Sequence, residues 1–441
     1  MTLEIGKILI SQKQYKKAFY IFSKLLNNKP NDFKVNFHMG KIYYELNNLN
    51  KSVFYFEKSS KIQPHNPNIL FNLALALRGM GKIEEAKKIY LNLISINSKD
   101  IKSYYGLFSL DINNINKELY QNLESMIKED KLTLFEKSLI NFIFSKFAKQ
   151  NGKLKYEINY LKLAHLNCYN SNLTFNNQSD YYYNNIISNN FNKIKFQDKF
   201  ELLSEFNNQN HIFIVGLPRS GSSLVETIIS HNEPDINSVG EFHGINRSIL
   251  EQIGKKIYTK DFDYKNYELS INKKKFQETL IQKYNNFEKK IYLDKSLENF
   301  FNIEIILQFF PNAKFIHTYR NFNDAVIGIY QAMLPELSWT HEIQNIINYI
   351  NIYNKTINYF KKKYPEKILD VELSKLSNQK EEQTKKILEF CNIKFNNNSL
   401  NFNKNNKLSN KTYSFLQVRK KIKGYDDNKY KPYYHLLNNI R

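Results

Sequence analysis

Small and aromatic residues recur with a fixed period in the N-terminal part of the chain. The period is 34, and it relates the small residues at 18, 52 and 86 and the aromatic residues Phe22, Phe56 and Tyr90. Within one unit, the apolar positions 18, 21, 22 and 25 follow the spacing of one helix face. Pro30 and Pro64 close the second helix in two of the three units. The pattern predicts three stacked helix pairs over about residues 3–104.

These units resemble tetratricopeptide repeats. We expect an α-helical tetratricopeptide solenoid over residues 1–110, followed by a helical connector and an irregular linker over 111–205. Residues 171–193 within that connector are rich in Asn and Tyr and show no clear periodicity. Stacked helix pairs leave one face of the array open, which favours docking of a polypeptide partner or substrate. The alternatives are a rigid spacer and a dimerisation element.

Short apolar runs alternate with helical segments in the second half of the chain. HIFIVG is followed by SLVETIIS, and KFIHTY is followed by DAVIGIYQAML. Such alternation predicts a parallel sheet with crossover helices. We therefore expect an α/β three-layer domain over residues 206–441, with a ligand crevice at the carboxyl ends of its strands.

Composition narrows the classes of function. The net charge of +22 fits a nucleic-acid binder, a membrane-surface protein or an enzyme for anionic substrates. Lys is scattered along the whole chain and no recognition module is visible, so we expect no nucleic-acid partner. No apolar run is long enough for a membrane span or signal peptide, which favours a cytoplasmic location. Cys168 and Cys391 alone supply neither a disulfide framework nor a cysteine metal cluster.

The run from His211 to Ser230 has the pattern of an anion site. It reads as a buried strand, a loop of small residues and the N-terminus of a helix, where backbone N–H groups converge on phosphate. Gly216 and Gly221 nearly meet the phosphate-loop pattern G-x4-G-K-[ST], but Ser222 replaces its Lys and the basic residue, Arg219, lies inside the loop. The alternative reading is an ordinary tight turn between a strand and a helix.

The loop LPRSGSS resembles the 5′-phosphosulfate loop of sulfotransferases, in the branch that includes tyrosylprotein sulfotransferases and bacterial repeat-bearing relatives. Three further segments follow in the family's order: SVGEFHG, the segment YLDKSLENFFNIEIILQFFPNAKFIHTYRNFNDAVIGIY at 292–330, and TYSFLQVRKKI at 412–422. The resemblance covers about residues 211–435. It implies a P-loop-like fold that binds 3′-phosphoadenosine 5′-phosphosulfate (PAPS) and transfers its sulfuryl group to an acceptor hydroxyl.

The resemblance also implies roles for individual residues. Glu241 would accept the proton of the acceptor hydroxyl, and Lys295 and Ser414 would act at the oxygen that bridges sulfur and phosphorus. Arg320 would hold the 3′-phosphate. Further contacts to the donor nucleotide would come from the loop residues Arg219, Ser220, Gly221, Ser222 and Ser223 and from the later positions Gly328, Arg419 and Lys420.

The chain departs from the family pattern at several positions. Gly328 replaces the Ser that contacts the 3′-phosphate, so either affinity for the 3′-phosphate is weaker or Arg419 and Lys420 compensate for the lost contact. Leu373 and Ser374 replace a Tyr-Glu pair that contacts adenosine. His243 and Arg247 follow Glu241 closely and would orient it or the acceptor, or else serve the fold, while His317 reads as a packing residue.

No metal is expected, because the chain has no H-E-x-x-H motif and no acidic ligand directly after KFIHTY. The sulfuryl group that is transferred carries less charge than a phosphoryl group, so cationic side chains can replace a divalent metal ion. The acceptor is left open among protein tyrosine, carbohydrate and small molecule, with the repeats favouring a polypeptide or a glycan. Two rival functions remain: an inactive sulfotransferase-like domain in a repeat scaffold, and a P-loop kinase.

Overall fold

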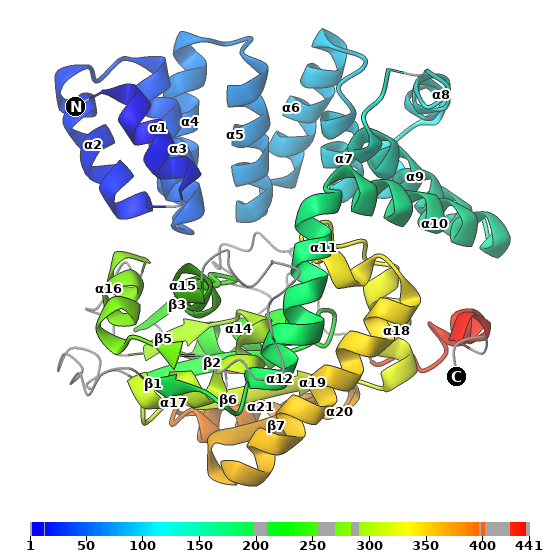
Figure 1. The fold of residues 1–441 in the computed structure, drawn as a ribbon. Coiled ribbons are helices and arrows are strands. Elements are labelled where there is room, and N and C mark those ends of the chain that lie inside the picture. Colours follow the sequence, from blue (N-terminus) through cyan, green and yellow to red (C-terminus); the bar gives the residue numbers. More distant parts are fainter. Residues whose placement is uncertain are drawn as a thin grey trace. The chain divides into compact units, whose positions relative to one another are not determined.

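A computed structural model describes residues 2–12, 14–129, 131–196, 210–233, 235–253, 270–283, 291–396, 398–401 and 424–437 (Figure 1). Two compact units divide them: a first unit that ends at Asn172 and a second unit that begins at Leu173 and includes residues 424–437. The connector expected over 111–205 is thus shared between both units. No helix in the described residues is long and apolar enough to cross a membrane.

The first unit is built of helices, as the period of 34 predicts (Figure 1). Three consecutive pairs match the predicted repeats: α1 (Leu3–Ser11) with α2 (Tyr15–Asn28), α3 (Phe33–Glu45) with α4 (Leu49–Ile62), and α5 (Pro67–Met80) with α6 (Ile83–Ile96). The array continues through α7 (Ile101–Leu110), α8 (Lys117–Met126), α9 (Leu134–Gln150) and α10 (Leu154–Ser171). Neighbouring helices along the chain pack on one another, so the contacts of this unit are local in sequence.

Close packing between helices explains why aromatic residues recur with the period of 34. The Phe22 ring lies where a side chain on Gly6 would begin, 2.5 Å from the position of its Cβ, and Phe56 covers Gly40 at 2.6 Å in the same way. Tyr90 makes the equivalent contact with Gly106 at 2.4 Å. Each aromatic ring therefore fills a space that only glycine leaves open, and any larger residue there would push the helices apart.

A five-stranded parallel sheet forms the centre of the second unit, in the order β3-β5-β2-β6-β7. Its strands are β2 (Asn210–Gly216), β3 (Ile236–Gly240), β5 (Ile291–Asp294), β6 (Lys314–Tyr319) and β7 (Ile368–Glu372). The runs HIFIVG and KFIHTY are β2 and β6, which pair directly in the register Val215 to His317. A separate two-stranded sheet joins β1 (Lys195–Phe196) to β4 (Ser270–Ile271).

Helices cover both faces of the sheet and give the predicted three layers. The ranges are α11 (Leu173–Tyr181), α12 (Ser188–Asn190), α14 (Ser222–Asn232), α15 (Gly244–Ile253), α16 (Lys273–Lys283), α17 (Ile303–Phe309), α18 (Phe322–Tyr330), α19 (Ile343–Lys363), α20 (Leu373–Asn378) and α21 (Lys380–Phe390). Ile212 and Ile214 of β2 pack with α14 and α21 on one face. Phe213, between them in sequence, points to the opposite face, where it stacks with Phe315 and lies tilted against Phe310.

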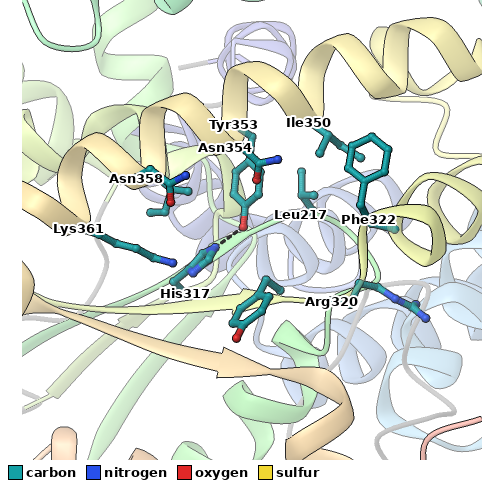
Figure 2. Close-up of a pocket in the computed structure, with 12 residues that line it drawn as sticks. Leu217, His317, Arg320, Phe322, Ile350, Tyr353, Asn354, Asn358 and Lys361 are labelled. Atoms are coloured by element: carbon teal, nitrogen blue, oxygen red, sulfur yellow. Dashed lines mark hydrogen bonds between the residues drawn. The ribbon is translucent and has the colours of Figure 1, made fainter. Parts of the chain in front are cut away.

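His317 of β6 lies on the α19 face and is 3% exposed. Its Nδ1 is hydrogen-bonded to Asp370 Oδ1 at 2.7 Å, and its Nε2 to the Tyr353 hydroxyl. Burial lowers the pKa of His317, which keeps the ring neutral. A cavity of about 150 Å³ lies here between β6, α18 and α19. Figure 2 shows His317 and Tyr353 turned toward each other, with the Arg320 guanidinium directed away from them.

Candidate functional site

The loop after β2 is held in one conformation by contacts with β6. Gly216 has φ of +144°, and a Cβ there would lie 2.2 Å from the backbone oxygen of Thr318. Ser220 Oγ donates to the Leu217 carbonyl at 2.6 Å and shares a hydrogen bond of 2.8 Å with Thr318 Oγ1. Arg219 adopts a left-handed φ of +67°, an uncommon conformation for a residue with a side chain. Contacts within the protein itself therefore hold the loop in shape.

Helix α14 starts directly at this loop. Gly221, with φ of +95°, stands at its N-cap and provides no side-chain capping bond. Ser222 and Ser223 follow in the first turn, and both are 7% exposed. The positive end of the helix dipole consequently faces the loop, as an anion site requires.

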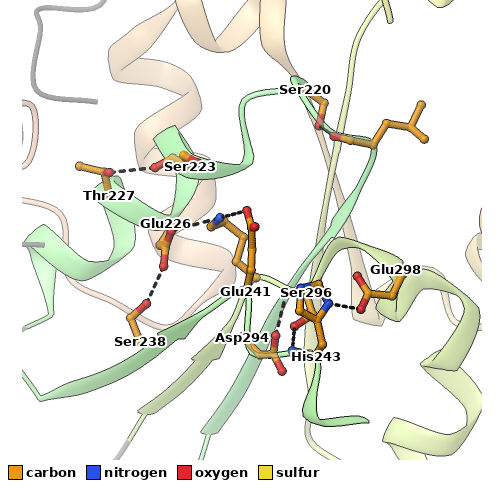
Figure 3. Close-up of polar contacts among 12 residues, drawn as sticks. Ser220, Ser223, Glu226, Thr227, Ser238, Glu241, His243, Asp294, Ser296 and Glu298 are labelled. Carbon is orange, nitrogen blue, oxygen red and sulfur yellow. Dashed lines mark hydrogen bonds and ion pairs between the residues drawn. The ribbon is translucent and has the colours of Figure 1, made fainter. Parts of the chain in front are cut away.

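A buried Lys with two carboxylates lies on the β5 side of this loop (Figure 3). Lys295 directly follows β5 and is fully buried. Its Nζ lies 2.7 Å from Glu241 Oε1 and 3.7 Å from Glu226 Oε2. Glu226 comes from α14, and its other oxygen accepts a hydrogen bond from Ser238 Oγ at 2.7 Å. The predicted pair of Glu241 and Lys295 is therefore in direct contact, and Glu226 is a partner that the sequence did not reveal.

The two carboxylates decide the protonation state of Lys295. Burial alone would lower the pKa of the amine, but the charges of Glu241 and Glu226 outweigh burial and raise it. Lys295 is therefore an ammonium ion over the whole physiological range of pH. Glu241 differs from its partner in access to solvent, because 42% of its side chain is exposed. The Glu241 carboxylate is therefore open to a second molecule.

Asp294 precedes Lys295 but does not pair with it. Its Oδ1 accepts from the Ser296 backbone N–H at 2.7 Å, because consecutive residues at a strand end point to opposite sides. Burial raises the pKa of Asp294 to about 6. The hydroxyl of Ser296 accepts from the backbone N–H of His243 at 2.7 Å, which fixes the segment that carries Glu241.

His243 forms an ion pair with Glu298 on the outer flank of this cluster (Figure 3). Burial would lower the pKa of His243, yet the charge and hydrogen bond of Glu298 raise it to about 9. The charge of Arg247 acts on the same carboxylate and helps to lower its pKa after the larger effect of His243. His243 and Arg247 thus converge on Glu298.

Arg320 occupies the β6 side of the loop and directly follows that strand. Its side chain is 6% exposed. The guanidinium donates to the Arg219 carbonyl at 3.2 Å, to Asp324 Oδ2 at 3.3 Å and to the Tyr425 hydroxyl at 2.8 Å. A Cβ at Gly328 would lie 3.3 Å from its Nη1. The structure therefore brings together Arg320, Gly328 and the loop residue Arg219.

Three tyrosines of residues 424–437 complete this side, and sequence reasoning did not identify them. Tyr425 donates to Asp324 Oδ2 at 2.5 Å, and Tyr434 donates to Asp324 Oδ1 at 2.6 Å. Tyr430 is 5% exposed, and the Arg320 guanidinium lies over its ring at 4.8 Å from the centroid. The available signal was the density of Tyr in the run YDDNKYKPYY.

The remaining predicted positions divide into two groups. Ser414, Arg419 and Lys420 lie outside the described residues. Leu373, where the family pattern has Tyr, packs against the loop at Gly221. A Cβ added to Gly221 would lie 2.8 Å from Leu373 Cδ1. Among the residues that the structure describes, no cluster of three or more His, Cys, Asp or Glu side chains has the arrangement of a metal site.

Family models match both units. Residues 211–397 match the sulfotransferase family, and residues 33–66 and 67–100 each match a tetratricopeptide repeat. The chain joins tetratricopeptide repeats to a sulfotransferase domain. The matched sulfotransferase segment holds the loop, Glu241, Lys295 and Arg320, so all three charged positions discussed above lie inside it.

Individual relatives are distant. An uncharacterized protein of Aquifex aeolicus is 23% identical over 418 residues, and the match covers 87% of this chain. It covers 51% of the relative, so the chain spans about half the length of that protein.

Two solved structures also have low similarity. The sulfotransferase domain of the Synechococcus PCC 7002 olefin synthase has a TM-score of 0.37 at 17% identity, covering 53% of this chain and 91% of that one. Sulfotransferase STF1 of Mycobacterium tuberculosis has a TM-score of 0.32 at 11% identity, covering 68% and 97%. The assignment of this site therefore depends on the family model and on the residues of the chain itself.

Proposed function

We propose that this protein transfers the sulfuryl group of PAPS to an acceptor hydroxyl, with Glu241 as the base. The observation that carries the proposal is the contact between Glu241, which is accessible, and Lys295, which is fully buried, beside the loop at the N-terminus of α14. A carboxylate that solvent can reach is placed to take a proton, and a buried cation next to it is placed to stabilise negative charge.

The donor nucleotide carries anionic groups at two ends, and the described residues offer a site for each. The N-terminus of α14 with Ser222 and Ser223 would bind the 5′ end. Arg320 would bind the 3′-phosphate, and its Nε is buried without a hydrogen-bond partner among the described residues. An unsatisfied buried N–H destabilises the protein by about 1 to 3 kcal/mol, so a ligand oxygen that accepts from this region supplies a missing partner.

The chemical step uses the β5 side of the loop. The acceptor oxygen forms a bond to sulfur while the bond from sulfur to the bridging oxygen breaks, and the acceptor proton passes to Glu241. Lys295 stays charged because its pKa is raised, so it can stabilise the charge that develops on the bridging oxygen. Glu226 remains an ion-pair partner of Lys295 after Glu241 has taken the proton.

The repeats supply the means to select an acceptor. A tetratricopeptide array leaves one face of its helices open, and such faces bind extended polypeptides. We therefore assign the acceptor to a polypeptide, or to a glycan carried by one, that docks on the first unit.

Binding of PAP, the desulfated product nucleotide, tests the donor site. Calorimetry without added metal should show micromolar binding of PAP to the wild type and at least about tenfold weaker binding to Arg320→Ala, because a charge-assisted contact is lost. AMP lacks the 3′-phosphate and should bind both proteins equally weakly. Lys363→Ala removes a cation that pairs with Glu304 at the surface, and it should bind PAP like the wild type.

Absence of PAP binding to the wild type would overturn the proposal and leave a repeat scaffold with an inactive domain. Binding of PAP that does not change in Arg320→Ala would place the nucleotide elsewhere. Once PAP binds as expected, labelled PAPS offered with tyrosine peptides, glycans and small phenols would identify the acceptor class.

A further inference from the structure

Gly328 leaves a gap in the site, and the residues expected to compensate for it, Arg419 and Lys420, lie outside the described residues. Position 328 on α18 faces Arg320, and the family's serine hydroxyl is missing there. A Cβ built on Gly328 would lie 3.3 Å from Arg320 Nη1 and also 3.3 Å from the Tyr430 hydroxyl oxygen. The phenol oxygen of Tyr430 therefore stands within hydroxyl reach of the place where a serine side chain would begin.

Tyr430 is held firmly at this position. Its ring is 5% exposed and lies beneath the Arg320 guanidinium, with the Lys429 ammonium 5.1 Å from the ring centroid. The neighbouring Tyr425 links the same segment to Asp324 and Arg320. A phenol with few exposed atoms and two anchoring contacts loses little freedom when a ligand binds.

The charges around the Tyr430 hydroxyl favour an anion. Burial would raise the pKa of this phenol, but the positive charges of Lys429, Arg320 and Arg219 outweigh burial and lower it. Cations that lower the pKa of a hydroxyl also make its O–H a stronger hydrogen-bond donor. Cationic side chains gathered around a neutral phenol form a favourable environment for a phosphate oxygen.

We propose that the Tyr430 hydroxyl replaces the missing serine at position 328 and donates a hydrogen bond to the 3′-phosphate held by Arg320. This inference rests on the proposed function, because it assumes a donor nucleotide with a 3′-phosphate. It explains how the chain keeps a hydroxyl at this place although the residue on α18 has become glycine. Glycine suits this position, because a side chain at 328 would make tight contacts of 3.3 Å with both the phenol oxygen and Arg320 Nη1.

Calorimetry with PAP and AMP on four proteins tests the role of Tyr430. Tyr430→Phe keeps the ring and removes the hydroxyl, so PAP affinity should fall by about tenfold to hundredfold while AMP affinity stays the same. Tyr364→Phe is the matched control, because its hydroxyl donates to Glu304 and makes no hydrogen bond with Arg320 or Tyr430, and PAP affinity should not change. The double variant Gly328→Ser with Tyr430→Phe should recover most of the lost affinity for PAP.

Three results would overturn the inference. Unchanged PAP affinity in Tyr430→Phe would show that the hydroxyl makes no contact with the phosphate. Increased affinity would show that the phenol blocks the site. Equal loss of PAP and AMP affinity would show a general effect on the fold. If the wild type itself fails to bind PAP, the proposed function fails first, so the two failures are distinguishable.

Discussion

Lys295 and Arg320 are both buried cations at the carboxyl ends of strands, and they stand on either side of β2 in the sheet. Their partners differ. Lys295 contacts two carboxylates, Glu241 and Glu226. Arg320 contacts one carboxylate, a backbone carbonyl and a phenol, and its guanidinium also lies over the Tyr430 ring.

The difference separates two kinds of chemistry. Carboxylates around an amine can exchange protons and keep the amine charged, which suits a site where a proton must move. A guanidinium does not lose its proton, and partners that are mostly dipoles leave its charge available to an anion. We infer that the β5 side handles the proton and the β6 side holds the nucleotide.

Glu241→Gln should have the largest effect of the variants considered, and it should change the β5 side alone. The amide keeps a polar contact with Lys295 but cannot accept a proton, so sulfuryl transfer should slow by about a hundredfold or more. PAP affinity should stay within about twofold of the wild type, since Glu241 is not a nucleotide contact. Transfer of label from PAPS and calorimetry with PAP measure the two quantities. A variant that transfers at the wild-type rate would exclude Glu241 as the base.

Glu226→Gln should give a smaller effect on the same side. Gln has the size of Glu and keeps an oxygen that can accept the hydrogen bond from Ser238. Lys295, however, loses one of its two carboxylates. The pKa of Lys295 should fall, because a negative charge that raises it is gone. The alkaline limb of the pH–rate profile should therefore move to lower pH.

Glu226→Gln has two controls: a surface variant, and a measurement of PAP affinity. Glu366 is exposed, and Glu366→Gln should leave the pH–rate profile in place. PAP affinity should not change in either variant. An alkaline limb that keeps its position in Glu226→Gln would show that Glu241 alone sets the charge of Lys295.

Glu298→Gln should give the smallest effect, on stability. The pKa of His243 is raised from 6.5 to about 9 by Glu298, so the pair stabilises the fold fully below 6.5 and loses this contribution as pH rises through about 9. The wild type should exceed the variant by roughly 1 to 2 kcal/mol near neutral pH, a figure reduced for screening because 37% of the His243 side chain is exposed.

Thermal unfolding at about pH 6 and about pH 10 measures this contribution. The difference in melting temperature between wild type and Glu298→Gln should shrink at the higher pH. PAP affinity, which belongs to the β6 side, should be the same in both proteins. A difference that is constant with pH would show that the pair contributes through packing and not through charge.

The sequence predicted those features that repeat or that carry a local pattern. Helix pairs followed from the period of 34, and β2 and β6 from their apolar runs, because each pattern lies within one short segment. The resemblance to sulfotransferases assigns Glu241 and Lys295 to one site, and the structure places the two in contact although 54 positions separate them.

Other features depend on how distant segments pack. Glu226 sits on a helix, where a Glu usually faces water, and its contact with Lys295 follows only from the placement of α14 beside β5. Asp294 is next to Lys295 in sequence, but the strand end turns the two side chains apart. Tyr430 reaches Gly328 only because residues 424–437 return to α18.

The strand order also has a consequence for synthesis of the protein. In the order β3-β5-β2-β6-β7, only the last two neighbours are consecutive along the chain. The central strand β2 pairs with β5 and β6. Its pairing therefore cannot be complete until both of these strands have emerged from the ribosome. The helices of the first unit contact their neighbours in sequence and can fold as they appear. Slower translation before β6 would therefore prolong exposure of an unpaired apolar strand, and chaperones would be needed most at that stage.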